Sequence, residues 1–246
     1  MTSDMSLYLL LTLCLSTPIS SSVVGQRQLA FSRDQGAGGR IGYVKVRVRR
    51  TGILFPRLIR FRDKRVMRKV NRQIDQLTRD FGCEAGTRNS YYNVRSSVEY
   101  ADTEIFSIYA SAEYFCGGAY PTNDANTSVT FDLRTGRQVQ FEDLFKDYQA
   151  NKREILRTIF AKQVERSEKM AASSKPKEST CEGDPDLYSL AHLEESTFDF
   201  NFSRVGLRVQ ADWPHVIAGC AELVNVPYIA LKRFAEPDGL LMRVAR

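Results

Sequence analysis

The segment from Tyr114 to Tyr148 constrains the fold of this chain more than any other part of the sequence. It predicts the end of one strand, a tight glycine turn and a second strand that ends at Phe131–Leu133. A hairpin at Thr135-Gly136 and a short helical stretch at Asp143–Phe145 follow. This order of elements predicts consecutive strands joined by short turns.

The flanking segments add strands and helices in groups. Tyr43 to Arg49 alternates apolar and basic side chains, which predicts a half-buried strand. Asp63 precedes apolar positions spaced by three or four residues as far as Phe81, with Gly82 after them, which predicts a capped helix. We further expect strands at 92–100, 105–114, 197–202 and 206–211, helices at about 151–170 and 227–234, and a last strand at 240–244. Strands and helices occur in groups along the chain and do not strictly alternate. The expected fold class is therefore α+β, an antiparallel sheet packed with two or three helices.

The N-terminus resembles an export signal. An apolar run from Leu7 to Leu15 precedes small residues near Ser22 and Gly25. The run is shorter than the roughly 20 apolar residues that cross a bilayer. Residues 1–25 are therefore expected to be a signal peptide with its cleavage region, which places a chain without a membrane span in the periplasm or outside the cell. Two features depart from this pattern: Asp4 is acidic, and no basic residue precedes the run. A misassigned start codon would explain both. A buried N-terminal strand is the alternative to a signal peptide.

Composition divides the remainder of the chain. Residues 26–42 are rich in glycine, arginine and glutamine without an apolar period, which predicts a flexible lead-in. Residues 43–246 are expected to form one α+β domain. A polar linker at 171–180 would divide this domain into two subdomains, at about 43–170 and 181–246.

Four cysteines remain after the expected leader, namely Cys83, Cys116, Cys181 and Cys220. They form no Cys-x-x-Cys pair, and the chain has only two histidines, so we expect neither a metal site nor a cofactor. Two disulfides are expected in an oxidising compartment. Four cysteines allow three pairings; we favour Cys83 with Cys116 and Cys181 with Cys220, because each pair joins neighbouring segments. Buried free thiols in a cytosolic protein are the alternative.

Read together, these segments resemble the RsiV-like extracytoplasmic domain family over roughly residues 43–245. The resemblance rests on Asp63-Lys64 with Val70-Asn71-x-x-Ile74, Gly117-Gly118-Ala119-x-Pro121, Phe131-Asp132-Leu133-x-Thr135-Gly136, Asp143-Leu144-Phe145, Gly206-Leu207, Pro214-His215 and Val226-Pro227-Tyr228. It implies an extracytoplasmic binding domain, which in the anti-sigma factor RsiV binds lysozyme and in the deacetylase PdaC accompanies a separate catalytic domain. Tyr120 stands where the family usually has histidine, so a role of that imidazole is not carried over. The few residues before the apolar run argue against an anti-sigma role of the RsiV type.

No catalytic constellation is recognised in the sequence. A nucleophile would need a base, and the only histidines are His192 and His215. His192 lies in an apolar stretch and is interpreted as a structural residue with satisfied hydrogen bonds. Trp213 beside His215 could form a contact surface, because aromatic residues dominate interface hot spots; a hydrophobic plug is the alternative. Carboxylate pairs for glycoside cleavage are defined by distances in space, so the sequence supports no enzyme.

Charge is distributed unevenly over a chain of net charge +6. Residues 40–72 hold thirteen basic residues and one acidic residue, whereas residues 178–199 hold seven acidic residues and no lysine or arginine. The basic block could hold an anionic wall polymer or lipopolysaccharide. Nucleic acid is not expected as a partner, since export and disulfides argue against it. The candidate residues for an anionic polymer are Arg57, Arg60, Arg62, Arg65, Arg68 and Arg72.

Two hypotheses of function follow. The first is an exported, disulfide-bonded binding module that recognises a cell-wall hydrolase such as lysozyme through Tyr120, Trp213, His215, Glu182, Asp184 and Asp186. Because animal lysozymes are basic, the acidic segment would offset the net positive charge of the chain. That segment could instead fold against the protein's own basic helix. The second hypothesis is an envelope structural or glycan-binding protein that holds anionic polymer through its basic face.

Overall fold

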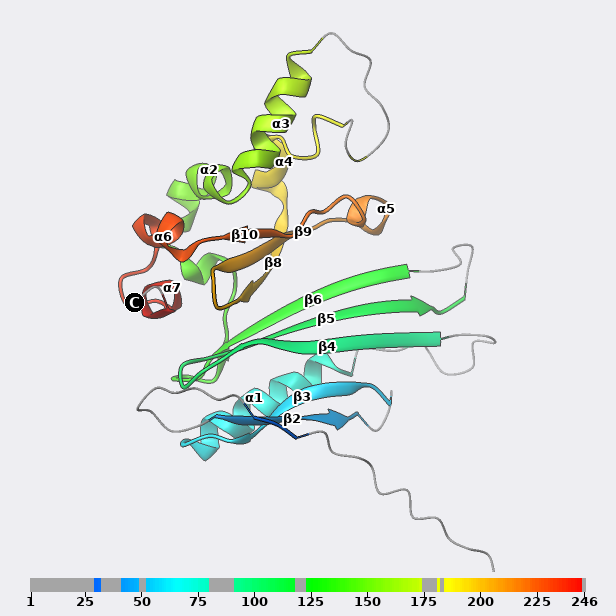
Figure 1. Ribbon diagram of the computed structural model, residues 1–246, viewed down its shortest axis with the longest axis vertical. Coiled ribbons are helices and arrows are strands. Elements are labelled where there is room, and N and C mark those ends of the chain that lie inside the picture. Colours follow the sequence, from blue (N-terminus) through cyan, green and yellow to red (C-terminus); the bar gives the residue numbers. More distant parts are fainter. Residues whose placement is uncertain are drawn as a thin grey trace, which may run out of the picture.

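The computed structural model describes residues 29–31, 41–48, 52–79, 91–117, 123–173, 181 and 184–244. These residues form three tiers (Figure 1). A sheet of long strands lies in the middle, with a small sheet and one helix on one side. A third sheet and most of the helices lie on the other side. The strands pair antiparallel throughout the three sheets, which confirms the α+β class expected from the sequence.

The first tier begins with a three-stranded sheet in the order β1-β2-β3, made of β1 (Leu29–Phe31), β2 (Gly42–Arg47) and β3 (Leu54–Arg60). Strand β1 lies within the segment expected as a lead-in. Strand β3 was not predicted, because Pro56, Arg57 and Arg60 break the apolar alternation that identifies strands. Phe55 and Leu58 are nevertheless fully buried, so packing against the rest of the protein stabilises this strand.

Helix α1 (Lys64–Leu77) packs against this sheet with Val66, Val70 and Ile74 buried. The carboxylate of Asp63 accepts hydrogen bonds from the backbone N–H groups of Arg65 at 2.7 Å and Val66 at 3.1 Å, which confirms the predicted N-cap. The helix ends at Leu77 with Thr78 as its C-cap, earlier than the apolar spacing predicted. Phe81 and Gly82, expected at its end, lie outside the described residues.

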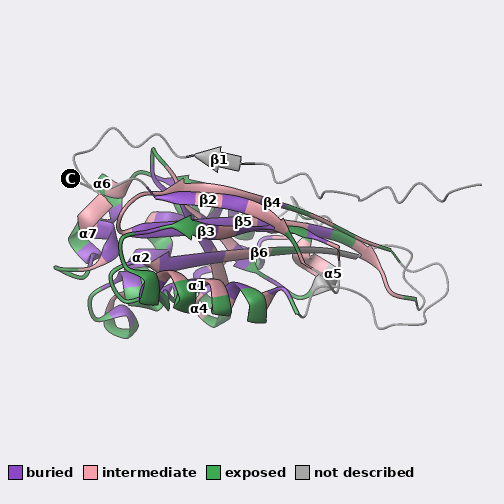
Figure 2. Ribbon diagram, turned by 90° about the horizontal axis from the view of Figure 1, so that it is seen from below, coloured by how far each residue is buried: buried purple, intermediate pink, exposed green. Residues whose placement is uncertain are grey.

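The middle sheet has the order β4-β5-β6-β7, with β4 (Tyr91–Ala101), β5 (Ile105–Phe115), β6 (Asn123–Asp132) and β7 (Arg137–Gln138). Gly136, at φ 66°, occupies the left-handed position of the predicted hairpin. One face of the sheet carries Phe106, Ile108, Val129 and Phe131 and packs on α1 and the first sheet. At the strand ends near α5, most residues are partly buried or exposed, although Ala112 is buried (Figure 2).

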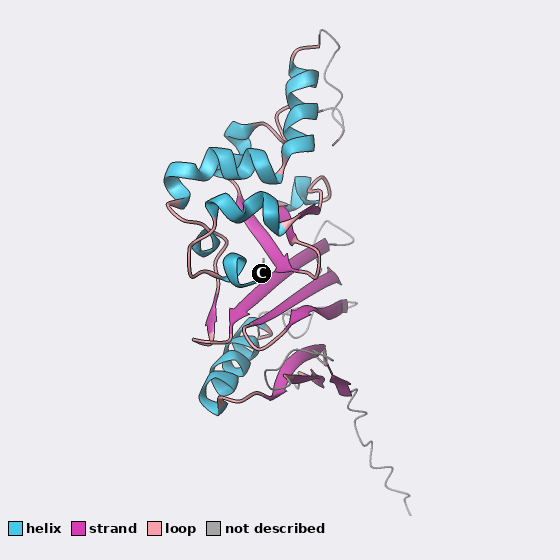
Figure 3. Cartoon of the chain, turned by 60° about the vertical axis from the view of Figure 1, so that its left-hand side comes forward, coloured by secondary structure: helices cyan, strands magenta, loops and turns pink. Residues whose placement is uncertain are grey.

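The helices of the third tier follow. Short helix η1 (Glu142–Leu144) precedes α2 (Tyr148–Ile159), α3 (Ala161–Ala171) and α4 (Leu190–Glu195). The single helix predicted at 151–170 is therefore wrong: Phe160 leaves the helical region at φ −100° and ψ 30°. Its ring is completely buried, so the bend lets Phe160 pack in the core between the two helices. Figure 3 shows α1 on one side of the strands and the other long helices on the opposite side.

The last sheet has the order β10-β9-β8, with β8 (Thr197–Phe202), β9 (Leu207–Asp212) and β10 (Val224–Val226). The pair β8–β9 agrees with the two strands predicted there. Short helices α5 (His215–Ala218), α6 (Tyr228–Leu231), η2 (Lys232–Phe234) and α7 (Leu240–Val244) complete the chain. Among the described helices, none has the length and apolar character needed to cross a membrane.

The final strand predicted at 240–244 is wrong, because these residues form α7. Helical geometry lets the adjacent Leu240 and Leu241 both enter the core, which the alternation of a strand would prevent. It also places Arg243, only 7% exposed, within 2.9 Å of Glu104 and 3.2 Å of Asp132. Long-range packing and an ion-pair network therefore decide the structure of this segment.

A polar seam joins the middle sheet to β8. The carboxylate of Asp199 accepts a hydrogen bond from the backbone N–H of Ser128 at 3.2 Å, and the Ser128 hydroxyl donates to Asn201 Oδ1 at 2.8 Å. Asn201 Nδ2 in turn donates to the carbonyl of Ile108 at 2.8 Å and to Ser107 Oγ at 3.1 Å. Together with the ion pair between Arg208 of β9 and Glu99 of β4, these contacts join the two sheets on one side of the region where they diverge.

Candidate functional site

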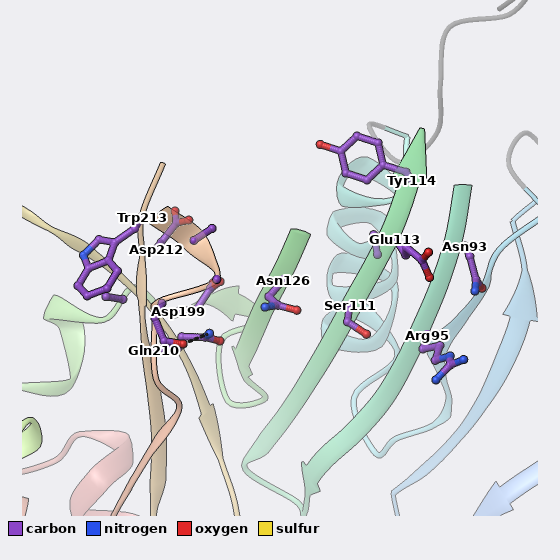
Figure 4. A pocket seen from close by; sticks show the side chains of 15 residues that line it. Asn93, Arg95, Ser111, Glu113, Tyr114, Asn126, Asp199, Gln210, Asp212 and Trp213 are labelled. Carbon is purple, nitrogen blue, oxygen red and sulfur yellow. Dashed lines mark hydrogen bonds between the residues drawn. The ribbon is translucent and has the colours of Figure 1, made fainter. Parts of the chain in front are cut away.

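A polar groove of about 890 Å³ lies where the middle sheet and the β8–β9 pair diverge (Figure 4). Its floor is formed by side chains on one face of β4, β5 and β6. Ser111 stands opposite both Arg95 and Asn126 in the register, and Asn93 stands opposite Glu113. Because alternate residues of a strand share a face, these five side chains form two adjacent polar rows. The sheet thus presents a polar surface opposite its apolar face.

The wall of the groove comes from Asp199, Gln210 and Asp212 on β8 and β9, together with the turn after α5. The side-chain amide of Gln210 donates a hydrogen bond to the carbonyl of Ala221 at 2.8 Å. The disulfide between Cys181 and Cys220, with Cα atoms 5.1 Å apart, ties the residue beside Ala221 to the start of the acidic segment. The hydrogen bond links β9 to the turn after α5, and the disulfide links that turn to Cys181.

The groove is negatively charged. Three carboxylates, those of Glu113, Asp199 and Asp212, line it together with one guanidinium, that of Arg95. Glu113, Asp212 and Arg95 are exposed, and within the described part of the chain none of them forms an ion pair. On a chain of net charge +6, this groove is a local region of opposite sign.

Asp199 is the most perturbed acid of the groove. Burial raises the pKa of Asp199 to about 6, the hydrogen bond from Ser128 opposes this shift, and the charge of Asp212 adds to it. Burial removes the carboxylate from water and so disfavours its ionised form, and this is the main cause of the raised pKa. Near neutral pH the carboxylate is ionised at a cost, and a cation placed beside it would relieve that cost.

Trp213 borders the groove, although it is only 6% exposed. Its indole N–H donates to Ser196 Oγ at 3.0 Å, and its ring lies 5.0 Å from that of Tyr188. The indole therefore supports the wall from within. His215 begins α5 directly after Pro214; the position of its side chain is outside the described structure.

His192 differs from the satisfied structural residue expected from the sequence. Its ring packs edge-on against Trp213 at 5.5 Å between ring centres. Its buried Nε2 atom has no hydrogen-bond partner among the residues that the structure describes. Apolar sequence neighbours predicted burial correctly but could not show which polar atoms lie near the imidazole.

The acidic segment is described only in part. Tyr120 and Glu182 lie outside the described residues. Asp184 accepts a hydrogen bond from the backbone N–H of Asp186 at 2.9 Å, and Asp186 is exposed. Glu194 pairs with Arg153 of α2 at 3.2 Å. Among the described acidic residues of 178–199, no ion pair is formed with α1, the basic helix proposed as an internal partner.

The cysteine pairing favoured from the sequence is present for Cys181 and Cys220. Cys116 is also disulfide-bonded. Cys83, the partner expected for it, lies outside the described residues.

The basic residues proposed for anionic polymer lie on the opposite side of the middle sheet from the groove, on β3 and around α1 (Figure 1). Arg57 is half-buried and forms an ion pair with Asp75. Arg60, the last residue of β3, and Arg62, which lies between β3 and α1, are both exposed. Arg65, Arg68 and Arg72 are exposed along α1 at spacings of three and four, so they share one helix face. Within the described residues these three form no ion pair, although the charge of Arg65 contributes to lowering the pKa of Asp63.

The sequence reasoning missed the groove residues Asn93, Arg95, Glu113, Asn126, Gln210 and Asp212. A signal for the floor was present, because the predicted strands at 92–100 and 105–114 both carry polar residues at alternate positions near their outer ends. Such a pattern indicates a sheet face that is polar. The wall gave no comparable signal, since Gln210 and Asp212 stand opposite the floor only through the tertiary fold.

Comparisons with known proteins bear on the fold. No family model matches the sequence, and no curated protein matches it. The structure is similar to the crystal structure of a DUF3298 family member from Bacteroides fragilis, with a TM-score of 0.51 and 12% identity over 89% of this chain and 95% of that chain. It also matches a DUF3298 family protein from Pseudomonas aeruginosa, with a TM-score of 0.41 and 10% identity over 86% of this chain and 94% of that chain. DUF3298 is the RsiV-like domain family, so the similarity in fold agrees with the resemblance seen in the sequence.

Proposed function

We propose that this protein is an exported binding module of the RsiV-like family, and that its polar groove recognises a cell-wall hydrolase such as a lysozyme. The observation that carries this proposal is the groove itself, where Glu113, Asp199 and Asp212 outnumber Arg95. A partner that presents basic side chains would neutralise these carboxylates. The DUF3298 fold supports the choice of family, and the disulfides fit an oxidising compartment.

The negative charge of the groove would offset the repulsion between this net-positive protein and a basic hydrolase. Two proteins of net positive charge repel each other at long range, which slows their encounter. A negative groove on one of them restores attraction over the last few ångströms, where pairs of opposite charge are screened least. The proposal therefore requires that the partner's contact surface be positively charged.

The groove is also preorganised for binding. Its floor residues belong to paired strands, and its wall is held by Gln210 and the Cys181–Cys220 disulfide. Binding to side chains that are already ordered costs less conformational entropy than binding to a loop that must fold.

The test is calorimetric titration of the oxidised mature protein with a basic animal-type lysozyme at near-physiological salt. We expect stoichiometric binding that weakens about tenfold or more when Glu113→Gln and Asp212→Asn are combined. A matched control replaces two exposed acids elsewhere, Glu195→Gln and Asp238→Asn, and should bind as the wild type does. Absence of binding to the wild type would refute the hydrolase proposal, and equal binding by the groove variant would refute the role of the groove.

The exposed face of α1 favours a second candidate function, an envelope protein that holds anionic polymer. Arg65, Arg68 and Arg72 form a row of like charges that makes no ion pair within the described residues, and such a row costs free energy unless an anion lies nearby. Cosedimentation with anionic cell-wall material should then fall steeply with salt and be lost when Arg68→Gln and Arg72→Gln are combined. Binding that does not respond to salt would contradict this alternative.

A further inference from the structure

The side of β6 that faces away from β5 borders the groove. β6 pairs with β5 along its whole length without a register shift. On its other side, among the described residues, only β7 pairs with it, at Phe131 and Asp132. We call the remaining part of this side, from Asp124 to Ser128, the β6 edge. Figure 1 shows that this edge of the middle sheet faces β8 and β9, which belong to a different sheet.

Hydrogen bonds near the inner end of β6 show which backbone groups point away from β5. The N–H of Ser128 donates to the carboxylate of Asp199 at 3.2 Å. The carbonyl of Thr130 accepts a hydrogen bond at 2.8 Å from the residue that follows β7. In an antiparallel strand the N–H and the carbonyl of one residue point to the same side, and alternate residues share a side. The backbone groups of Asp124 and Asn126 therefore also point toward the wall of the groove.

Asn126 leaves this edge open. The residue is exposed, and its Oδ1 atom accepts a hydrogen bond from the hydroxyl of Tyr109 at 2.8 Å, which holds the side chain on the floor. On the outer side, the backbone of Asn126 makes no hydrogen bond within the described residues. Figure 4 shows Asn126 between the floor and the wall residues Asp199 and Gln210. An extended chain in the groove would meet these backbone groups directly.

Asp199 shows what this edge accepts as a partner. Its carboxylate takes the hydrogen bond from Ser128 that the carbonyl of a neighbouring strand would otherwise accept. Beside Asn126 the edge instead borders the groove of about 890 Å³. This volume lies within the range of about 300–1,000 Å³ that is typical of ligand sites. Between Ser128 and Asn126 the edge thus passes from a side-chain partner to open space.

The β6 edge also lacks common protection against pairing with other chains. Proteins often block an exposed edge with proline, lysine or a bulge, because unpaired backbone groups recruit further strands. Residues 123–132 contain no proline and no lysine, and the pairing of β5 with β6 contains no bulge. A straight, unblocked edge at a groove is suited to bind an extended segment.

We propose that the β6 edge binds an extended basic segment of the partner protein as an additional strand of the middle sheet. Hydrogen bonds to the backbone of Asp124 and Asn126 supply affinity, and alternate side chains of the added strand give specificity. Glu113 and Asp212 lie on opposite sides of Asn126 (Figure 4) and form no ion pair within the described residues. Lysine or arginine side chains of the segment would pair with these carboxylates. The strand site rests on the proposed function, because both use the charge of the groove.

A second copy of this chain is another occupant that an open edge admits. It fits less well than a basic segment, because two copies would bring two negative grooves together, and like charges repel. The two occupants differ in one measurable respect: pairing of two copies depends on protein concentration alone, whereas binding of a basic segment requires that the segment be added.

The test is an NMR titration of the full mature protein with the blocked peptide Thr-Lys-Val-Lys-Thr, with Thr-Gln-Val-Gln-Thr as the uncharged control. We expect saturable shifts with the lysine peptide only. We also expect slower hydrogen exchange of the Asn126 amide, because the added strand accepts its hydrogen bond. Glu113→Gln combined with Asp212→Asn should weaken binding of the peptide, whereas the control pair Glu195→Gln with Asp238→Asn should leave it unchanged.

A proline substitution tests the backbone hydrogen bond itself. Asn126→Pro removes the N–H that points away from β5, and proline is tolerated at such edge positions. Asn126→Ala loses the same side chain but keeps the N–H, so it is the matched control. The proline variant should bind the lysine peptide about two- to tenfold more weakly than the alanine variant, at equal urea midpoints. If the proline variant does not fold, the exchange of the Asn126 amide in the wild type decides the question.

Lysozyme added to the same samples separates the strand site from the proposed function. Lysozyme binding without slower exchange at Asn126, together with no saturable shifts from the lysine peptide, would overturn the strand site and leave the proposed function standing. Peptide binding with slower exchange at Asn126, but no lysozyme binding, would support the strand site and remove lysozyme as the partner.

Three other results would contradict the proposal. Equal binding of the two peptides would refute the role of the carboxylates. Equal affinity of the proline and alanine variants would show that side chains, and not the edge, hold the peptide. Slower exchange at Asn126 that follows protein concentration without any peptide would assign the edge to a second copy of the chain.

Discussion

We expect the Asn201→Ala substitution to destabilise the protein by about 2–4 kcal/mol, because it removes the central residue of the seam between the middle sheet and β8. Asn201 is 3% exposed and takes part in three hydrogen bonds, as an acceptor from Ser128 and as a donor to Ile108 and Ser107. Alanine can make none of them and leaves a small cavity in addition.

The magnitude follows from what each partner loses. The carbonyl of Ile108 is buried and loses one acceptor contact, which costs about 1–3 kcal/mol. Ser107 keeps its hydrogen bond with Thr130 at 2.8 Å and the one from the backbone N–H of Phe202 at 3.2 Å, so its loss is small. Ser128 is half-buried and can bond to water instead. The lost packing of the amide accounts for about a further 1 kcal/mol.

Urea unfolding of the wild type, Asn201→Ala and Ser128→Ala at one pH would measure these costs. Ser128→Ala removes a single hydrogen bond at the edge of the seam and should cost about 0.5–1.5 kcal/mol. The double variant should cost less than the sum of the two, because both substitutions break the same Ser128–Asn201 bond. If Asn201→Ala lost less than Ser128→Ala, or if the two effects were additive, the seam would not hold the sheets together as argued.

Further predictions concern the groove, a buried glycine and the disulfide. Because burial raises the pKa of Asp199 to about 6, above its unfolded value, the contribution of Asp199 to the stability of the wild type should fall as pH rises from about 4 to 6. Asp199→Asn should therefore gain stability relative to the wild type at pH 7 compared with pH 4, as urea midpoints at the two pH values would show; a pH-independent difference would contradict the shift. At Gly206 an added Cβ would lie 2.3 Å from the backbone oxygen of Val226, so Gly206→Ala should lower the melting temperature strongly. Gly219→Ala, where no atom lies within 4 Å of the new Cβ, should leave it nearly unchanged, and equal effects would refute the clash. Replacing Cys181 and Cys220 with serine should cost about 2–4 kcal/mol in chemical unfolding. It should also weaken lysozyme binding through the groove wall; unchanged affinity would show that the disulfide does not support the wall.

The sequence by itself determined those features that depend on neighbouring residues. Asp63 predicted an N-cap because the hydrogen bonds of a cap span only two or three positions. Gly136 predicted a hairpin because few other residues adopt a positive φ. Alternation predicted β4, β5 and β8–β9, since side chains of period two can bury one face of a strand. The fold class and the strand pairs β4–β5 and β8–β9 therefore followed from local patterns, and Cys181–Cys220 was one of three pairings that the sequence allowed.

Only the tertiary structure decided the segments whose local preference is weak or contradicted. β3 is a strand despite its proline and arginines because Phe55 and Leu58 have a core to enter. α7 is a helix because Leu240, Leu241 and Arg243 each meet a different long-range partner. The break at Phe160 likewise depends on core residues that lie far away in sequence.

The candidate sites depend on the tertiary structure even more strongly. The groove exists because the seam at Asn201 and the Arg208–Glu99 ion pair join the two sheets at one end while the sheets diverge beyond them. Backbone hydrogen bonds likewise join Leu144 and Lys146 to Phe234 and Glu236, which lie far later in the chain. Periodicity shows which face of an element is polar. It does not show which polar faces meet, because that choice is made by the packing of buried surface across the whole chain.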